Sequence, residues 1–443
     1  MDLKEELLRK ADEPNRLSKK YHQHYFGKME TIPKCVVRSF DDFAIWYTPG
    51  VAEVCKAISQ YPEKVFDYTN KGNIVAIVND GTRILGLGNI GPEAGLPVME
   101  GKALLFKYLG GVDAIPLSIN TTNAEEIINF CKWIKPSFGG INLEDIEKPK
   151  CFHILDRLED ESKIPIWHDD QQGTATVVVS GAINALKIVG KKIDGTKISM
   201  IGSGAANLRI AELLIFAGVN PKNIVMVDSK GILSHHREDL MNDQKKWEIC
   251  LKTNSEDLQG GAAEAIKNTD MCVAMSKSLP GTIKKEWITS MQDKSIVFAC
   301  ANPLPEIWPW DALDAGATII ATGRSDFSNQ LNNSLVFPGI FRGVLDVRAT
   351  KITNEMCLAA AIEIAKVAED KGLSEEYIVP SMDEWEVFIR EAIVVGMKAT
   401  DQGLAQVKRS RAELQEMSQK TITRSRDMVQ TLMKENYISE PPD

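Results

Sequence analysis

Two pairs of adjacent acidic residues are the first candidates for chemistry in this sequence. Glu144-Asp145 lies in GGINLEDI and Asp169-Asp170 lies in IWHDDQQGTA, and each pair ends an apolar run. Adjacent carboxylates repel each other, and a divalent cation such as Mg2+ or Mn2+, which prefers carboxylate oxygens, would offset that repulsion. The plainer alternatives are a solvated turn for the first pair and a helix cap at Asp170 for the second. Together, the two pairs predict a divalent metal site.

Two glycine-rich loops compete as the binding loop for a dinucleotide. Gly86–Gly91 is a complete GxGxxG motif, whereas Gly202–Asn207 (GSGAAN) lacks the third glycine. Such a loop needs a strand before it and a helix directly after it, because the helix N-terminus faces the pyrophosphate. Pro92, Gly95 and Pro97 predict that no helix begins cleanly after the first loop. We therefore predict the cofactor loop at the second motif, with these binding residues: Gly202, Gly204, Ala205 and Ala206. The alternative is a tight turn that binds nothing.

An acidic residue closes the strand that follows this loop. Asp228 can accept hydrogen bonds from the hydroxyls of the adenine ribose, which favours NAD. Ser229 and Lys230 follow at once, and both can bind the 2′-phosphate of NADP. The residues therefore predict a nicotinamide dinucleotide and leave the choice between NAD and NADP open.

The pattern around these residues predicts an α/β protein with two domains. Residues 73–80 and 112–119 read as strands, and 124–134 as a helix. Short apolar runs then alternate with helical stretches, which is typical of a doubly wound parallel sheet of the Rossmann type; they are residues 197–202, 223–228, 271–275, 295–300 and 318–321. We predict a second, α/β substrate domain at 1–165, the nucleotide domain at 166–340, and C-terminal helices at 341–443 that complete the substrate domain. The last stretch, from about residue 404, is predicted as a helical extension.

Composition narrows the partners. The 443 residues carry a formal net charge of −9, which argues against a nucleic-acid-binding protein. No apolar run is long enough for a transmembrane helix, and the first residues do not resemble a secretory signal. The eight cysteines are scattered, which argues against a disulfide scaffold. We expect a cytoplasmic protein that binds a small molecule and neither nucleic acid nor membrane.

Longer motifs resemble the malic enzymes, specifically the short bacterial and archaeal type. The resemblance extends over roughly residues 20–400, and the motifs that carry it are YHQHYFGKMETIPK, WYTPGVAEVC, NDGTRILGLGNIGPEAGLPVMEGKALLFKYLGGVDAIPL, GGINLEDI, HDDQQGTA, FACANPLPE, ATGRSDFSNQLNN and FPGIFRG. It implies oxidation of L-malate to pyruvate and CO2 with reduction of NAD or NADP, and dependence on Mg2+ or Mn2+. A homodimer or a higher homo-oligomer is expected.

The resemblance also implies roles for single residues. Tyr47 matches the family's general acid, Lys102 its general base, and Asp169 the acid that helps to set the protonation of that lysine. Arg83 matches the arginine that binds a malate carboxylate. The remaining matches are the metal ligands Glu144, Asp145 and Asp170, and the amides Asn302 and Asn333 that hold substrate and nicotinamide. Asn89 departs from the family, which commonly has Asp there, so substrate orientation at that loop is in doubt.

The chemistry makes demands on these side chains. A lysine can accept the proton of the malate hydroxyl if burial and neighbouring cations lower its pKa toward neutrality, and Lys102 lies among apolar residues. Two other interpretations stay open. One is a related dehydrogenase that needs no metal and does not decarboxylate. The other is a nucleotide-binding regulator with a decayed site, which Asn89 and Asn207 would permit.

Overall fold

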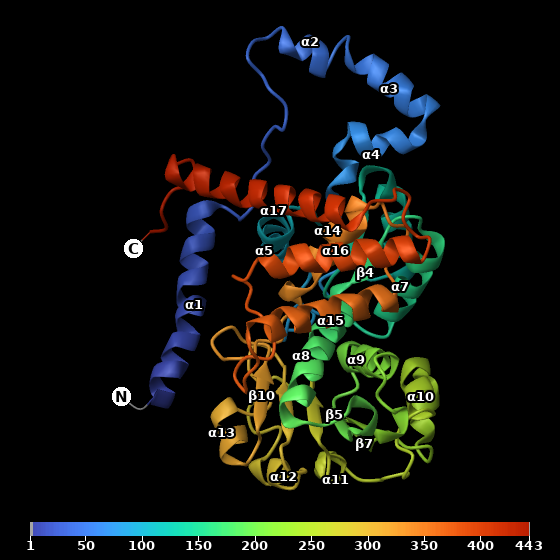
Figure 1. Ribbon diagram of the computed structural model, residues 1–443, viewed down its shortest axis with the longest axis vertical. Helices are drawn as coiled ribbons and strands as arrows, with labels where there is room; N and C mark the ends of the chain where they lie inside the picture. The colour runs from blue at the N-terminus through green and yellow to red at the C-terminus, as the bar shows by residue number, and fades with distance from the viewer. Residues whose placement is uncertain (1–2, 443) are drawn as a thin grey trace.

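The computed structural model describes residues 3–442 and contains two β-sheets, each covered by helices (Figure 1). The first sheet has the order β2-β1-β3-β4, and all its strands are parallel. Its strands are β1 (Ile74–Asn79), β2 (Asp113–Ser118), β3 (Gly140–Leu143) and β4 (Ile166–His168). The strands predicted at 73–80 and 112–119 are β1 and β2, so both predictions are confirmed.

The second sheet has the order β10-β9-β8-β5-β6-β7. Its strands are β5 (Ile198–Ile201), β6 (Ile224–Asp228), β7 (Gly231–Ile232), β8 (Met271–Ala274), β9 (Ile296–Ala299) and β10 (Ile319–Thr322). All neighbours pair in parallel except β7, which is antiparallel to β6. The chain order reverses at β5, from which one half extends through β6 and the other through β8 to β10. This is the doubly wound, Rossmann-type sheet that the five apolar runs predict.

Helices connect the parallel strands and cover both sheets. Around the first sheet they are α5 (Pro92–Gly110), α6 (Ala124–Ile134) and α7 (Lys150–Glu161). Around the second they are α8 (Thr174–Val189), α9 (Ala205–Phe216), α10 (Gln244–Cys250), α11 (Ala262–Ile266), α12 (Lys285–Thr289) and α13 (Pro309–Asp314). Short helical turns are η1 (Pro62–Lys64), η2 (Asn70–Gly72), η3 (Lys135–Ser137), η4 (Asp169–Gly173), η5 (Ile193–Gly195), η6 (Pro221–Asn223), η7 (Glu238–Asn242) and η8 (Asn333–Leu335).

The C-terminal helices return to the first sheet's helical layer. They are α14 (Phe337–Asp346), α15 (Asn354–Lys371), α16 (Glu386–Asp401) and α17 (Arg411–Lys434). Helices α14 and α17 contact α5, and α15 packs on α8. The Phe106 ring of α5 lies 4.6 Å from the Phe337 ring and 5.3 Å from the Phe341 ring, both on α14. Such aromatic packing fixes α5 against α14.

One sequence expectation about the first glycine-rich loop is wrong. Helix α5 begins directly after Gly91, at Pro92, and continues through Pro97. Proline is tolerated in the first turn of a helix because its missing N–H would have no partner there. Gly91 supplies the positive φ of 88° that turns the chain into the helix.

The N-terminal segment projects from the body. Helix α1 (Leu3–Tyr25) runs along one side, and α2 (Asp42–Trp46) and α3 (Val51–Gln60) form an arm beyond α17, followed by α4 (Val65–Tyr68) (Figure 1). We call residues 29–61 the arm. No side chain of α3 is buried. None of the helices in the described chain is long and apolar enough to cross a membrane.

Candidate active site

The two acidic pairs meet at one edge of the first sheet. Glu144 follows β3 and Asp169 follows β4, and these strands pair directly, with Leu143 opposite His168. Because parallel strands end at the same edge, both pairs lie at their carboxyl ends, as predicted. A hydrogen bond from the Asp145 amide to the Asp170 carboxylate, 2.9 Å long, joins the two loops.

Three of these acids are arranged to share a cation. Glu144, Asp145 and Asp170 each offer an oxygen within 4.8 Å of the others. Burial raises the pKa of Glu144 well above its usual value, and burial with the Asp170 charge raises the pKa of Asp145 to about 8. The Oδ2 atom of Asp145 is buried and accepts no hydrogen bond. An oxygen-only set of this charge fits a hard divalent cation such as Mg2+ or Mn2+, which would relieve the repulsion.

Lys102 of α5 lies against the acidic cluster and is only 7% exposed. Its Nζ donates to both Glu144 oxygens at 2.7 Å, pairs with Asp169, and lies 4.5 Å from the centre of the Phe337 ring. Asp169 also accepts a 2.9 Å hydrogen bond from the Trp167 indole. The structure therefore brings Lys102 and Asp169 together, as the resemblance implies.

The predicted direction of the Lys102 pKa is wrong. Burial lowers the pKa of the ammonium, but the Asp169 and Glu144 carboxylates outweigh burial and raise it above its usual value. The sequence shows the apolar neighbours of Lys102 in its own helix, whereas the carboxylates come from two distant strand ends.

The substrate-binding candidates come from both sheets and contact the acidic cluster or the first glycine-rich loop. Arg83 follows β1; its amide donates to the Asp145 carbonyl at 3.0 Å, and its side chain is exposed. Asn333 lies close to Asp169, since a Cβ added at Gly173 would stand 2.0 Å from an Asp169 oxygen and 3.2 Å from the Asn333 Cβ. Asn302 packs against the first glycine-rich loop, because its carbonyl is 2.5 Å from a Cβ placed at Gly86.

Tyr47 does not belong to this cluster within one chain. It follows α2 on the arm, which lies beyond α17, and it is 72% exposed. Lys102, by contrast, is buried beneath α14 and paired with carboxylates. Within one chain, the structure therefore does not bring Tyr47 to Lys102.

The second glycine-rich loop has the predicted setting. It follows β5 and opens α9 at Ala205, and Ala206 lies in the same first turn. Gly202 has a φ of +99°, and a Cβ added at Gly204 would meet nothing within 4 Å, which leaves room for a phosphate group. Asn207 replaces the missing third glycine; its amide donates to the carbonyls of Ile201 and Gly202 at 3.0 and 2.9 Å and braces the turn.

Several residues that shape the site were not singled out from the sequence. Asn142 orients Glu144 through a 2.8 Å hydrogen bond, Trp167 orients Asp169, and Phe337 covers Lys102. Asn142 and Trp167 lie in strands beside the acidic pairs, so their position was a usable signal. Phe337 is far away in sequence, and only the packing of α14 on α5 reveals it.

Comparison with known proteins agrees with this geometry. The family description "Malic enzyme, N-terminal domain" matches residues 26–159, and "Malic enzyme, NAD binding domain" matches 171–399. The chain is 47% identical to the bifunctional malic/malolactic enzyme of Bacillus subtilis, covering 90% of this chain and 96% of that one. It is 48% identical to the NAD-dependent malic enzyme of Geobacillus stearothermophilus, covering 84% and 77%.

Solved structures give the same result. The Entamoeba histolytica malic enzyme superposes with a TM-score of 0.97 at 43% identity, covering 100% of this chain and 93% of that one. The malic enzyme of Pyrococcus horikoshii has a TM-score of 0.91 at 47% identity, covering 95% and 98%. A Rossmann-type sheet beside an acidic, lysine-containing site defines a dinucleotide-dependent oxidoreductase. The chain belongs to the malic enzyme family.

Proposed function

We propose that this protein oxidises L-malate to pyruvate and CO2 with reduction of NAD or NADP, in a reaction that needs Mg2+ or Mn2+. The observation that carries the proposal is the contact of Lys102 with two acids of the cluster formed by Glu144, Asp145, Asp169 and Asp170. A dehydrogenase that needs no metal has no use for such a cluster, whose buried charge is costly.

The proposed roles follow the balance of the reaction. Lys102 first transfers a proton to Asp169 and becomes neutral. Hydride then leaves C2 of malate for the nicotinamide, while the hydroxyl proton passes to Lys102. The C3–C4 bond then breaks, CO2 leaves, and the electron pair forms the enolate of pyruvate, which becomes pyruvate when C3 is protonated. Tyr47 returns a proton to C3. Arg83 grips a carboxylate of the substrate, and Asn302 and Asn333 position substrate and nicotinamide.

Glu144, Asp145 and Asp170 would hold the divalent cation, which supplies Lewis-acid stabilisation of the negative charge on the C2 oxygen. Glu144 and Asp145 are buried, whereas Asp170 is partly exposed, so charge interactions at the first two acids are weakly screened by water. Asn142 and Trp167 keep Glu144 and Asp169 in place, and the Phe337 ring closes the apolar side of the Lys102 pocket.

We further propose that the working unit is a homodimer in which the arm of a second copy delivers Tyr47. The arm carries uncovered apolar side chains, among them Phe40 at 90% exposure, Phe43, Ile45 and Trp46. A short segment that buries so little cannot offset its own ordering entropy. A surface of this kind marks an interaction site, and the partner's site gains the tyrosine it lacks.

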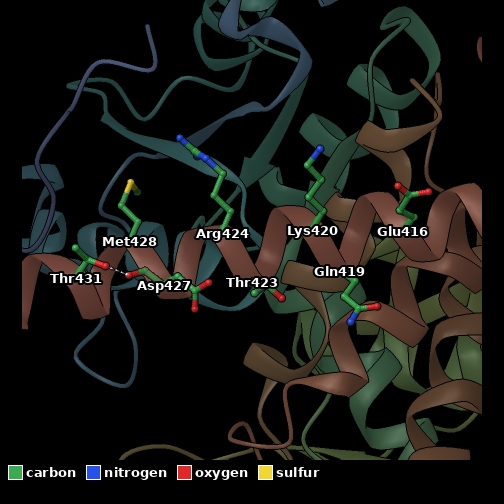
Figure 2. Close-up of a pocket in the computed structure, with 8 residues that line it drawn as sticks. All are labelled: Glu416, Gln419, Lys420, Thr423, Arg424, Asp427, Met428 and Thr431. Atoms are coloured by element: carbon green, nitrogen blue, oxygen red, sulfur yellow. Dashed lines mark hydrogen bonds between the residues drawn. The ribbon is translucent and has the colours of Figure 1, made fainter. Parts of the chain in front are cut away.

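The outer face of α17 supports the same dimer. It bounds an open hollow of about 770 Å3 lined by α17 alone (Figure 2). The lining residues are Glu416, Gln419, Lys420, Thr423, Arg424, Asp427, Met428 and Thr431. None of them belongs to the acidic cluster, so this hollow is not the catalytic pocket. Its two acids and two bases suit contact with a like surface better than binding of one small anion.

The test is purified protein with L-malate, Mn2+ and either NAD+ or NADP+, assayed for reduced cofactor, pyruvate and lactate. We expect pyruvate in step with reduced cofactor, and none with EDTA. Full turnover in EDTA without CO2 release would favour a plain dehydrogenase. Tight cofactor binding without turnover would favour the regulator.

The absence of a disulfide pattern among the cysteines supports a cytoplasmic location, which fractionation of the source cells would test.

A further inference from the structure

The carboxylate at the end of β6 has no free hydrogen-bonding capacity. The Asp228 Oδ1 atom accepts from the Lys230 amide at 2.9 Å and from Arg237 Nη1 at 2.7 Å. Its Oδ2 atom accepts from Arg237 Nη2 and from Lys246 Nζ, both at 3.0 Å. A carboxylate offers about four lone-pair positions, so these donors use all of them. A ribose hydroxyl would have to displace a charged donor to bind Asp228.

Cations outnumber the carboxylates around this residue. Lys230 and Arg237 share Asp239, while Arg237 and Lys246 share Asp228. These bases therefore exceed their two acidic partners by one positive charge. The Arg237 and Lys246 side chains are each 15% exposed, so both remain accessible from solvent.

A further lysine joins the cluster to the cofactor loop. Lys148, in the loop after β3, donates from Nζ to the Ser203 carbonyl at 3.0 Å. Burial and the Lys246 charge lower the pKa of Lys148, and the Asp228 and Asp243 charges partly offset this by raising it. The glycine turn and the end of β6 thus face one cationic region, with open space over Gly204.

We propose that Asp228 is a positioning residue that holds Arg237 and Lys246 as a binding site for the 2′-phosphate of the cofactor, so that NADP is preferred to NAD. The proposal rests on the proposed function, because it assumes that the adenosine end of the cofactor lies beyond the glycine turn. Arg237 and Lys246 neutralise the Asp228 charge, so the carboxylate repels the phosphate little. The Lys246 ammonium gives one hydrogen bond to Asp228 and has two further N–H donors for a phosphate. Arg237 would attract the phosphate through its positive charge, since its N–H groups already bind Asp228, Asp239 and the Gly231 carbonyl. A bare ribose could gain only by breaking existing hydrogen bonds.

Binding of cofactor fragments to the full-length protein tests this without turnover. Adenosine 2′,5′-bisphosphate and adenosine 5′-monophosphate differ only in the 2′-phosphate. We expect the bisphosphate to bind at least about tenfold more tightly in calorimetry at low salt, with the advantage shrinking as ionic strength rises. Equal or tighter binding of the monophosphate would overturn the proposal.

Two lysine variants separate the local contact from general charge. Lys246→Gln should lower the affinity ratio of the two fragments by about tenfold. Lys245→Gln is the matched control, because Lys245 is the adjacent lysine and its ammonium pairs with Asp156 instead of Asp228. In this variant the affinity ratio of the two fragments should stay unchanged. An unchanged ratio in Lys246→Gln, or equal weakening of both fragments, would refute the 2′-phosphate site.

Asp228→Asn tests the other half of the argument. If Asp228 only positions its bases, this variant keeps the wild-type affinity for adenosine 5′-monophosphate. A loss of about tenfold or more for that fragment would show that Asp228 binds the ribose directly and would overturn the proposal. Malate turnover is measured separately, so inactive protein that still prefers the bisphosphate contradicts the proposed function and not this site.

Discussion

The exchange of the arm between two copies can be tested by subunit complementation. Tyr47→Phe removes the hydroxyl at an exposed position, and Lys102→Gln removes the charge while keeping a donor for Glu144 and Asp169. Each variant alone should lose about 10²–10⁴-fold in kcat, the usual contribution of general acid–base catalysis. Both should keep the wild-type dimer on a sizing column and a similar far-ultraviolet spectrum.

The expected gain on mixing follows from the geometry. In a heterodimer with exchanged arms, one site receives the intact Lys102 of the first variant and the intact Tyr47 of the second. The other site receives both substitutions and is inactive. Random reassortment of equal amounts makes about half of the dimers mixed, each with one working site of two, so activity should return to about a quarter of wild type.

The assay is malate-dependent cofactor reduction after the two variants are co-refolded, or co-expressed with different tags and purified through both. Each variant refolded alone is the control. If each chain used its own Tyr47, every site in the mixture would carry one defect. Activity that stays at the level of the single variants in verified heterodimers would therefore refute exchange.

Three further predictions concern the cation, the packing of the site and one buried acid. Mn2+ should raise the Tm of the wild type, because binding at a hundredfold excess over Kd adds about 2.7 kcal/mol of stability, and it should raise the Tm of Asp145→Asn far less. Differential scanning fluorimetry measures both Tm shifts, and equal shifts would contradict the proposed ligand set. Gly173→Ala should lower kcat/KM by about 10²-fold, because the new Cβ would displace Asp169, whereas Gly195→Ala, with nothing within 4 Å, should leave it unchanged; equal kinetics of the two variants would show that Asp169 needs no fixed position. Glu391 is fully buried, its oxygens accept no hydrogen bond, and burial raises its pKa well above the ordinary 4.5, so native stability should fall by up to about 1.4 kcal/mol per pH unit as pH rises above that value. In urea unfolding between pH 5 and 7, Glu391→Gln should reduce this slope by up to about 1.4 kcal/mol per pH unit and leave the part that Glu144 and Asp145 contribute. A slope equal to that of the wild type would assign all of it to other groups.

Much of the site was predictable from sequence because parallel strands end at one edge of their sheet. The apolar runs before Glu144 and Asp169 placed both acidic pairs at strand ends, and the direct pairing of β3 with β4 brought them together. The cofactor loop was predictable for a similar reason: a strand, a glycine turn and a helix are consecutive in the chain. The start of α5 at Pro92 was not predictable from the general exclusion of proline from helices, because the first helical turn tolerates proline.

Local sequence determined which residues can form each element and which chemistry they can perform. Tertiary structure decided which distant groups share an environment. Lys102 contacts Glu144, Asp169 and Phe337. Asp228 pairs with Arg237 and Lys246. These contacts set the direction of each pKa, because charge interactions depend on distance in space and not along the chain. Tyr47 shows the same division: its type suits a proton donor, and only the fold reveals that its own chain leaves it outside the site.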